Sequence, residues 1–289
     1  MNLSLNVPTL LEYFSALVHA DADFPLLESA ISIAQDEYPE ISVQQVLEEV
    51  DQLQARLLRR LPTDAGPLQR LRTLNQFVYR DLNFAGNFNN FTDPDNSYVH
   101  VVLRTRLAVP ISMAVIWLEL AQAIGLKARG IAFPGYFLVK VNLSEGQVVI
   151  DPLTGQSLSR EDLSERLEPY RQVSGFIEDQ EVPLALYLQA ATPRDIIARM
   201  LLNLKEIHTA NEDWVRLIAV LDRLIVLLPE AWGEYRDRGL AHAETGRSGH
   251  ALEDLETYLA NTMHAKADGQ FPDRAAIAQR VAELRRATN

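Results

Sequence analysis

Three residues in the middle of the chain are of the types that acyl-transfer enzymes use. Ser112 stands at the start of an apolar segment, Asp151 follows a short apolar run, and His100 precedes both. A serine hydroxyl becomes a nucleophile when a base within hydrogen-bonding distance takes its proton and a carboxylate orients that base. A triad of these three residues is chemically allowed because triads occur in any chain order. The chain has no cysteine, which excludes thiolate catalysis, disulfides and Cys-ligated metals.

Each of these residues also has a structural interpretation. A serine in the first turn of a helix satisfies backbone groups with its hydroxyl, which is the alternative for Ser112. Asp151 precedes Pro152, which cannot continue a strand, so its carboxylate is suited to accept hydrogen bonds from backbone donors there. We expect this architectural role for Asp151. The histidines after residue 200 show no metal-ligand spacing, and we expect neither a metal nor a cofactor.

A polar loop precedes this region. Residues 83–97 are rich in Asn and end in Asp93-Pro94-Asp95-Asn96-Ser97, a composition that predicts turns. A long loop inside a domain is either functional or a structural wrap over the domain edge, and both interpretations remain open. Asp93, Asn96 and Ser97 are its candidate residues for a cleft loop.

The segment after the loop predicts a buried helix and a small sheet. Residues 110–124 are apolar on nearly every face, which is typical of a central helix, and Gly125 ends it. Strands are predicted over residues 128–133, 136–141 and 147–150, with a hairpin turn over 144–146.

Helical patterns flank this centre on both sides. Apolar residues recur with helical spacing over residues 8–20, 25–37, 43–60 and 67–80, and again from about residue 192 to the end. Near the end, Tyr235, Gly239 and Gly246 fit the tetratricopeptide pattern, in which small residues let two helices approach closely. A degenerate copy lies 34 residues earlier, with Lys205 in the place of the glycine. Two such helix pairs are too few to fold alone, so we expect them to pack on another part of the chain.

Short motifs occur in a fixed order over roughly residues 25–260. They are Ala34–Pro39, Asn83-Phe84, Gly86-Asn87, Asp93-Pro94, Asn96–Tyr98, Val102–Arg104, Arg106, Val109–Ser112, Gly125-Leu126, Phe133–Gly135, Phe137–Val139 and Asp151-Pro152. In these motifs the chain resembles the SirB-type proteins, which join a transglutaminase-like domain to a C-terminal tetratricopeptide segment. The resemblance implies a divergent papain-like fold and no defined activity.

The resemblance also locates a degenerate catalytic site. In papain-like and transglutaminase-like folds a Cys at a helix start attacks, a His on the next strand is the base, and an Asp on the following strand orients the His. The Cys position falls here at Pro110, or at Ser112 in a shorter helix. The His position holds Tyr136, while Asp151 keeps the Asp. A tyrosine, whose side chain ordinarily has a pKa of about 10, is a weak base at neutral pH, so Tyr136 either fills the space of the imidazole or presents a hydroxyl to a ligand.

Composition excludes several classes of protein. A hydrophobic content of 47% in 289 residues is enough for a sizeable core. The net charge of −12 argues against a nucleic-acid surface, although residues 100–151 carry about +2. The N-terminus lacks the basic region of a signal peptide and no apolar run is long enough to span a bilayer, so we expect a cytoplasmic protein with no membrane partner.

The sequence therefore predicts an α+β protein in three parts. Residues 1–82 are expected to form a helical subdomain, 83–190 a transglutaminase-like core and 191–289 a tetratricopeptide-like helical domain. The preferred function is a non-catalytic interaction or regulatory protein that binds a protein or peptide segment through the repeat helices and the cleft. The alternative is a hydrolase or acyltransferase with a rebuilt site based on Ser112.

Overall fold

The chain divides into two structural units, each with its own core. The computed structural model of the protein describes residues 7–144, 146–173, 183–263 and 271–288. Residues 20–200 form one unit, here called the sheet unit, and residues 1–19 together with 201–289 form the other, the repeat unit. The predicted division at residues 82 and 190 follows changes in composition, and it stays a prediction beside this division by contacts.

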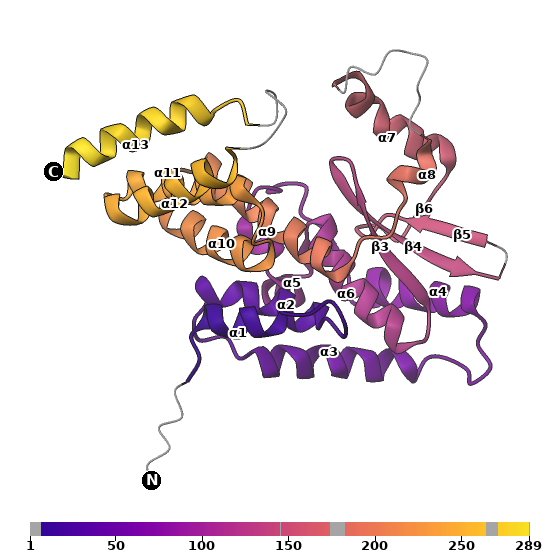
Figure 1. Ribbon diagram of the computed structural model, residues 1–289. Helices are drawn as coiled ribbons and strands as arrows, with labels where there is room; N and C mark the ends of the chain where they lie inside the picture. The colour runs from indigo at the N-terminus through magenta and orange to yellow at the C-terminus, as the bar shows by residue number, and fades with distance from the viewer. Residues whose placement is uncertain (1–6, 145, 174–182, 264–270, 289) are drawn as a thin grey trace, which may run out of the picture. The chain divides into compact units, whose positions relative to one another are not determined.

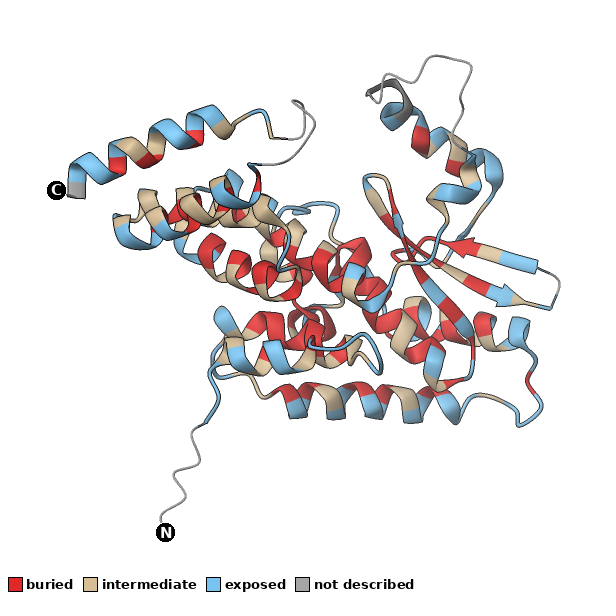
Figure 2. Ribbon diagram, in the orientation of Figure 1, coloured by how far each residue is buried: buried red, intermediate tan, exposed pale blue. Residues whose placement is uncertain are grey.

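Helix α6 (Pro110–Ala123) is the central element of the sheet unit (Figures 1 and 2). Pro110 suits the first helical position because its missing N–H would be unpaired there anyway. Apolar residues cover almost the whole circumference, so the helix is buried along most of its length. It ends where Gly125 adopts a φ of +71°, and Arg70 Nη1 donates to the carbonyl of Ile124 at 2.8 Å. The prediction of a buried central helix is confirmed.

The sheet is antiparallel and ordered β3-β4-β5-β6. Its strands are β3 (Lys127–Phe133), β4 (Tyr136–Leu143), β5 (Gly146–Ile150) and β6 (Ser157–Leu158). Ile131 pairs with Leu138, and Val139 pairs with Ile150, which sets the register of the three longer strands. The three predicted strands are confirmed, while Glu145 of the predicted turn lies outside the described residues.

The sheet is covered on both faces. Helix α6 contacts β3 and β4 on one face. On the other face, Leu163 and Leu167 of α7 (Arg160–Val173) pack with Ile131 and Leu138, and the short helix α8 (Leu184–Tyr187) adds partly buried side chains. Leu158, Leu184 and Leu188 on this second face stay half-buried.

The remaining helices of the sheet unit surround α6. They are α2 (Leu26–Ser32), the 3₁₀ helix η1 (Ile33–Asp36), α3 (Val43–Leu58), α4 (Pro67–Asn75), the π-helix η2 (Gln76–Asp81), the 3₁₀ helix η3 (Pro94–Ser97) and α5 (Val99–Thr105). The strands β1 (Ala85–Gly86) and β2 (Leu107–Ala108) pair in parallel, which places the start of the polar loop beside the segment that leads into α6. The predicted helices are present, although two of them end in 3₁₀ or π turns rather than as continuous α-helix.

The repeat unit consists of antiparallel helices. They are α9 (Pro193–Ala210, which enters the unit at Leu201), α10 (Trp214–Leu227), α11 (Trp232–Glu244), α12 (Ser248–Asn261) and α13 (Arg274–Thr288). A Cβ atom on Gly239 would lie 2.8 Å from Cγ of Leu255, so the glycine allows α11 and α12 to approach closely, as its place in the repeat predicts. The N-terminal helix α1 (Leu10–Leu17) packs against α10, with the Arg223 guanidinium 4.9 Å from the Phe14 ring centroid.

Within the described residues, no helix is both long and apolar enough to cross a membrane.

Candidate functional site

Asp151 is the centre of a hydrogen-bonded cluster at the end of β5. Its side chain is buried, and its Oδ1 accepts from the backbone N–H of Leu153 at 3.0 Å. Oδ2 accepts from Nη2 of Arg166 at 3.0 Å, and the Tyr136 hydroxyl lies 3.1 and 3.3 Å from the two carboxylate oxygens. The expected acceptor role is therefore present, but one backbone donor and two side chains fill it, rather than several backbone donors.

Tyr136 is a hydrogen-bond donor in this cluster. The side chain lies at the start of β4, directly after Gly135, and it is half-buried. Burial raises its pKa above the ordinary value, and the adjacent Asp151 carboxylate raises it further. The phenol stays protonated at pH 7 and cannot serve as a base there. The guanidinium of Arg166 lies 5.0 Å from the ring centroid, a distance typical of a cation–π contact.

A second tyrosine supports the same turn. Tyr79 donates from its hydroxyl to the carbonyl of Pro152 at 2.8 Å, and burial together with the charge of Asp151 raises its pKa. Asn75 Nδ2 donates to the carbonyl of Gly155 at 2.9 Å. Helix α4 and the π-helix η2 thus hold the backbone on which Asp151 is placed.

Arg166 was not among the site residues predicted from the sequence. It lies on α7, between Leu163 and Leu167, which pack on the sheet. An arginine next to a sheet-facing leucine stands at the edge of the apolar face, where its guanidinium reaches the sheet. The leucine spacing was a usable signal, but which end of the sheet α7 covers depends on tertiary packing.

Ser112 is held by backbone carbonyls at the start of α6. It is fully buried, and its Oγ lies 2.6 Å from the carbonyl oxygen of Asn96 and 3.1 Å from that of Val109. A hydroxyl that donates to a carbonyl is not activated for attack, since activation requires a base. Pro110, the other candidate for the Cys position, is buried and has no nucleophilic group.

His100 lies on α5, in a different set of contacts. Its ring stands edge-on to Tyr38 with the centroids 4.7 Å apart, and its Nδ1 is buried without a hydrogen-bond partner among the described residues. Burial lowers its pKa, and the nearby Arg104 lowers it further. The hydrogen bonds of the described residues link Ser112 to Asn96 and Tyr136 to Asp151, and they do not link His100 to either pair.

The polar loop is tied to the start of α6 through Asn96. Its Nδ2 donates to the carbonyl of Asn90 at 2.7 Å, and its Oδ1 accepts from Nδ2 of Asn87 at 3.0 Å. Asp93 caps the 3₁₀ helix η3 by accepting from the backbone N–H of Asp95 at 3.0 Å. Ser97 is buried, and its Oγ has no hydrogen-bond partner among the described residues. Asp93 and Asn96 thus both bond backbone groups of the loop.

Comparison with known proteins gives the family. The profile of the transglutaminase-like superfamily matches residues 44–202, and a tetratricopeptide-repeat profile matches residues 204–284. The chain belongs to the transglutaminase-like superfamily. Tetratricopeptide repeats stack helix pairs into binding surfaces, so the second match supports a protein-interaction role for this transglutaminase-like protein. No solved structure matches the chain.

Several bacterial proteins resemble this transglutaminase-like chain over most of its length. A "UPF0162 protein" of Xylella fastidiosa (strain Temecula1) is 35% identical over 242 residues, which cover 83% of this chain and 84% of that protein. The "UPF0162 protein PA3419" of Pseudomonas aeruginosa is 27% identical, covering 81% and 83% of the two chains. The "UPF0162 protein YchA" of Escherichia coli K12 is 25% identical, covering 83% and 88%. These matches confirm the family resemblance seen in the motifs.

Proposed function

We propose that this transglutaminase-like protein binds a partner protein or peptide and does not catalyse acyl transfer. The cluster around Asp151 is the observation that carries the proposal. An enzyme of this family needs a carboxylate that orients an imidazole beside a nucleophile. Here the carboxylate is occupied by the Tyr136 hydroxyl, the Arg166 guanidinium and the N–H of Leu153.

The repeat helices support the binding role because ion pairs fix them in advance of any partner. Lys205 on α9 bridges Glu234 and Asp237 on α11, at 2.7 and 2.6 Å. Arg236 on α11 pairs with Asp273, just before α13, at 2.7 Å. A surface held in its bound arrangement loses less entropy on association than a flexible one.

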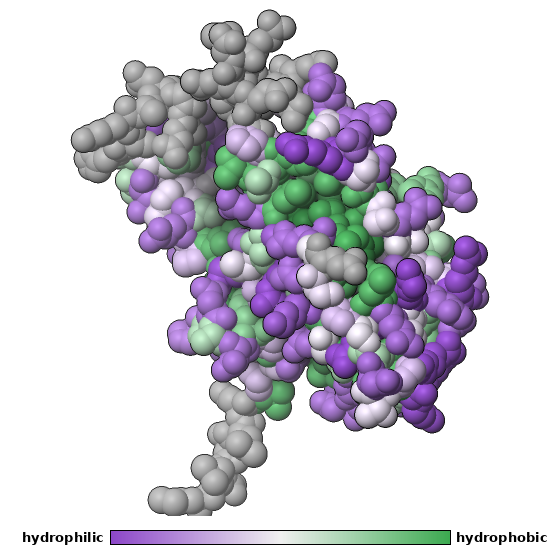
Figure 3. Space-filling view, turned by 90° about the vertical axis from the view of Figure 1, so that its right-hand side faces the viewer, coloured by the Kyte–Doolittle hydropathy of each residue, from purple (hydrophilic) through white to green (hydrophobic). Residues whose placement is uncertain are grey.

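An apolar surface of the sheet unit supports the same role. Figure 3 shows hydrophobic residues gathered among polar ones on the side of the molecule where β5 and β6 lie. Leu158 and Leu184 lie on the face of the sheet that α7 and α8 cover. They are half-buried and pack against the apolar residues of that face, such as Leu163. Exposed apolar areas rimmed by polar residues commonly mark sites where proteins bind.

The test compares catalysis with binding in the full-length chain. We expect no labelling by a serine-directed fluorophosphonate and no turnover of amide, ester or glutamine-donor substrates. A partner captured by crosslinking should then bind the purified wild-type protein, Ser112→Ala and Asp151→Asn with equal affinity. Turnover by the wild type that disappears in Ser112→Ala would overturn the proposal and favour the Ser112-based hydrolase.

A further inference from the structure

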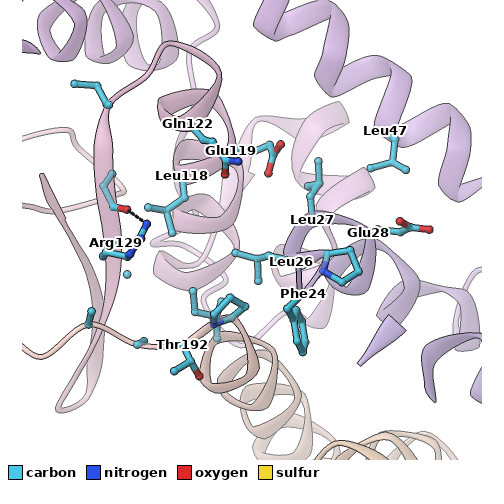
Figure 4. A pocket seen from close by; sticks show the side chains of 18 of the residues that line it. Phe24, Leu26, Leu27, Glu28, Leu47, Leu118, Glu119, Gln122, Arg129 and Thr192 are labelled. Atoms are coloured by element: carbon cyan, nitrogen blue, oxygen red, sulfur yellow. Dashed lines mark hydrogen bonds between the residues drawn. The ribbon is translucent and has the colours of Figure 1, made fainter. Parts of the chain in front are cut away.

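The sheet unit contains a cavity of about 770 Å³ whose lining residues include none of the Asp151 cluster. It lies between the start of α2, the C-terminal half of α6, the N-terminal half of β3 and the start of α9 (Figure 4). Ser112 lies in the first turn of α6, whereas Glu119 of the cavity lies two turns later, roughly 10 Å along the axis at 1.5 Å per residue. The cavity volume falls within the range of about 300–1,000 Å³ that is usual for small-molecule sites.

Apolar side chains line much of the cavity wall, beside polar and charged ones. Leu26 and Leu118 project from facing helices, and Figure 4 shows their side chains on opposite sides of the space. Leu126, just before β3, and Ile196 of α9 are both buried and close the cavity on these sides. Phe24 adds an aromatic ring from the segment before α2. Such a wall recognises an apolar body of ligand rather than a fully polar one.

Glu119 is a half-buried carboxylate of the wall, and among the described residues no cation pairs with it. Glu119 Oε1 accepts from the neutral side-chain amide of Gln54 at 3.2 Å. Burial raises the pKa of Glu119, and its charged neighbour, Asp51 on α3, is also a carboxylate and raises the pKa further. A buried charge is costly without a partner of opposite sign, and a cation placed between Glu119 and Asp51 would supply one.

Arg129, the basic residue that lines the cavity, does not neutralise Glu119. Arg129 is exposed on β3, and its Nη1 donates to the carbonyl of the adjacent Ala128 at 3.1 Å. Figure 4 shows Arg129 on the wall opposite Leu26, with the side chain of Leu118 between its guanidinium and Glu119. The cavity therefore combines an apolar interior with a carboxylate end on α6 and α3.

We propose that this cavity binds a small amphipathic amine. Its ammonium group contacts Glu119 and Asp51, and its apolar body packs against Leu26, Leu118 and Ile196. The charge of the wall selects a cation, and the volume and lining select a compact apolar substituent. This site is independent of the partner-binding function proposed above, since it uses none of the residues of the Asp151 cluster.

The test uses the intact protein and three probes of similar shape but different charge. These are 2-phenylethylamine, the neutral 2-phenylethanol and the anionic 3-phenylpropionate, each titrated at pH 7.5 by calorimetry and by protein-observed NMR. We expect the amine to bind at least tenfold more tightly than the alcohol, and the acid more weakly than both. The affinity for the amine should fall as the pH is lowered through the pKa of Glu119, which burial raises, because protonation of the carboxylate removes its charge.

Two variants, each of which removes one charge from the wall, test which residue recognises the ligand. Glu119→Gln keeps the acceptor for Gln54 but removes the charge. The affinity of this variant for the amine should fall to its affinity for the alcohol. Arg129→Gln is the matched control on the opposite wall, and it should leave the affinity for the amine unchanged or slightly higher. Thermal unfolding of both variants verifies that they are folded, and NMR shifts confined to the cavity residues verify the location.

Three results would overturn the proposal. Equal binding of amine and alcohol would show that the carboxylates do not recognise the ligand. Weaker binding in Arg129→Gln with preference for 3-phenylpropionate would show that the cavity selects an anion instead. No binding of the amine at several millimolar would show that the cavity does not take this class of ligand.

Discussion

Tyr136 stands where the family resemblance predicts a histidine, and a tyrosine there changes what the neighbouring carboxylate does. An imidazole beside an aspartate can take up a proton at neutral pH, and the aspartate stabilises the resulting cation. A phenol beside Asp151 holds its proton, because burial and the carboxylate both raise its pKa. The positive charge that the carboxylate favours comes instead from the guanidinium of Arg166, which pairs with Oδ2 of Asp151. The cluster is thus suited to hold the end of β5 in place.

The first prediction concerns Asp151. Asp151→Ala should destabilise the protein by about 1–3 kcal/mol, because it leaves the buried N–H of Leu153 and the Tyr136 hydroxyl without their acceptor. Urea unfolding measures the change, and Asp64→Ala, at an exposed loop position, is the control and should lie within about 0.5 kcal/mol of wild type. If Asp151→Ala kept the wild-type midpoint but lost partner binding or activity, Asp151 would belong to a working site rather than to the architecture.

The second prediction is a pH dependence that arises from Tyr38. Its hydroxyl donates to Oδ1 of Asp95 at 2.5 Å, and burial, followed by this hydrogen bond, raises its pKa to about 12. An unfolded tyrosine titrates near 10, so the contribution of this group to stability is complete below pH 10 and is lost as the pH rises through the folded pKa. The difference in the free energy of unfolding between wild type and Tyr38→Phe should therefore become smaller as the pH rises above 10.

Urea midpoints of both proteins at pH 8, 10 and 11 would show this narrowing. At pH 8 the variant should be less stable by about 1–3 kcal/mol, the usual value of a hydrogen bond to a charged group. A difference that stays constant to pH 11 would mean that Tyr38 ionises alike in the folded and unfolded protein.

At the scale of elements, periodicity predicted what each segment becomes but not what it packs against. The all-round apolar character of residues 110–124 indicated a central helix, and the structure buries it. The spacing around Gly239 indicated the close approach of α11 and α12, which the structure also has. The packing of α1 on α10 and of Arg166 on Asp151 was not predictable, because both contacts join segments whose spacing in sequence carries no periodic signal.

The third prediction follows from α1. Phe14 on α1 is fully buried, and Arg223 of α10 lies beneath its ring, so removal of α1 exposes a charged side chain and an apolar face. A fragment of residues 192–289 should be partly unfolded or aggregated, whereas addition of residues 1–19 as a peptide should restore a cooperative thermal transition. The same peptide with Phe14→Ala is the control and should restore much less. A fragment that melts sharply without the peptide would contradict the expected role of α1.

At the scale of the whole molecule, composition and contacts divide the chain differently. The Asn-rich stretch at residues 83–97 is a marked change of composition, yet it does not separate two cores, because Asn96 binds the start of α6 and the strands β1 and β2 pair across it. The helices α2 and α3 likewise pack on α6. A loop that is polar in sequence can be joined to a core through buried polar residues such as Asn96, and the pattern of a single sequence does not show this.

The last prediction tests whether the two units open independently. Each unit has a glycine with no room for a side chain: a Cβ on Gly239 would lie 2.8 Å from Leu255, and a Cβ on Gly130 would lie 2.7 Å from Phe137. Gly239→Val and Gly130→Val should each cost about 1–3 kcal/mol through overpacking. Because each clash lies in a separate core, Gly239→Val should speed amide exchange in α11 and α12 but not in β3 to β5, and Gly130→Val should do the reverse.

Hydrogen-exchange mass spectrometry measures exchange in both units in one sample. The control is Gly249→Ala, because an added Cβ there meets nothing within 4 Å. Faster exchange in both units from either valine would show instead that the chain unfolds as one cooperative body.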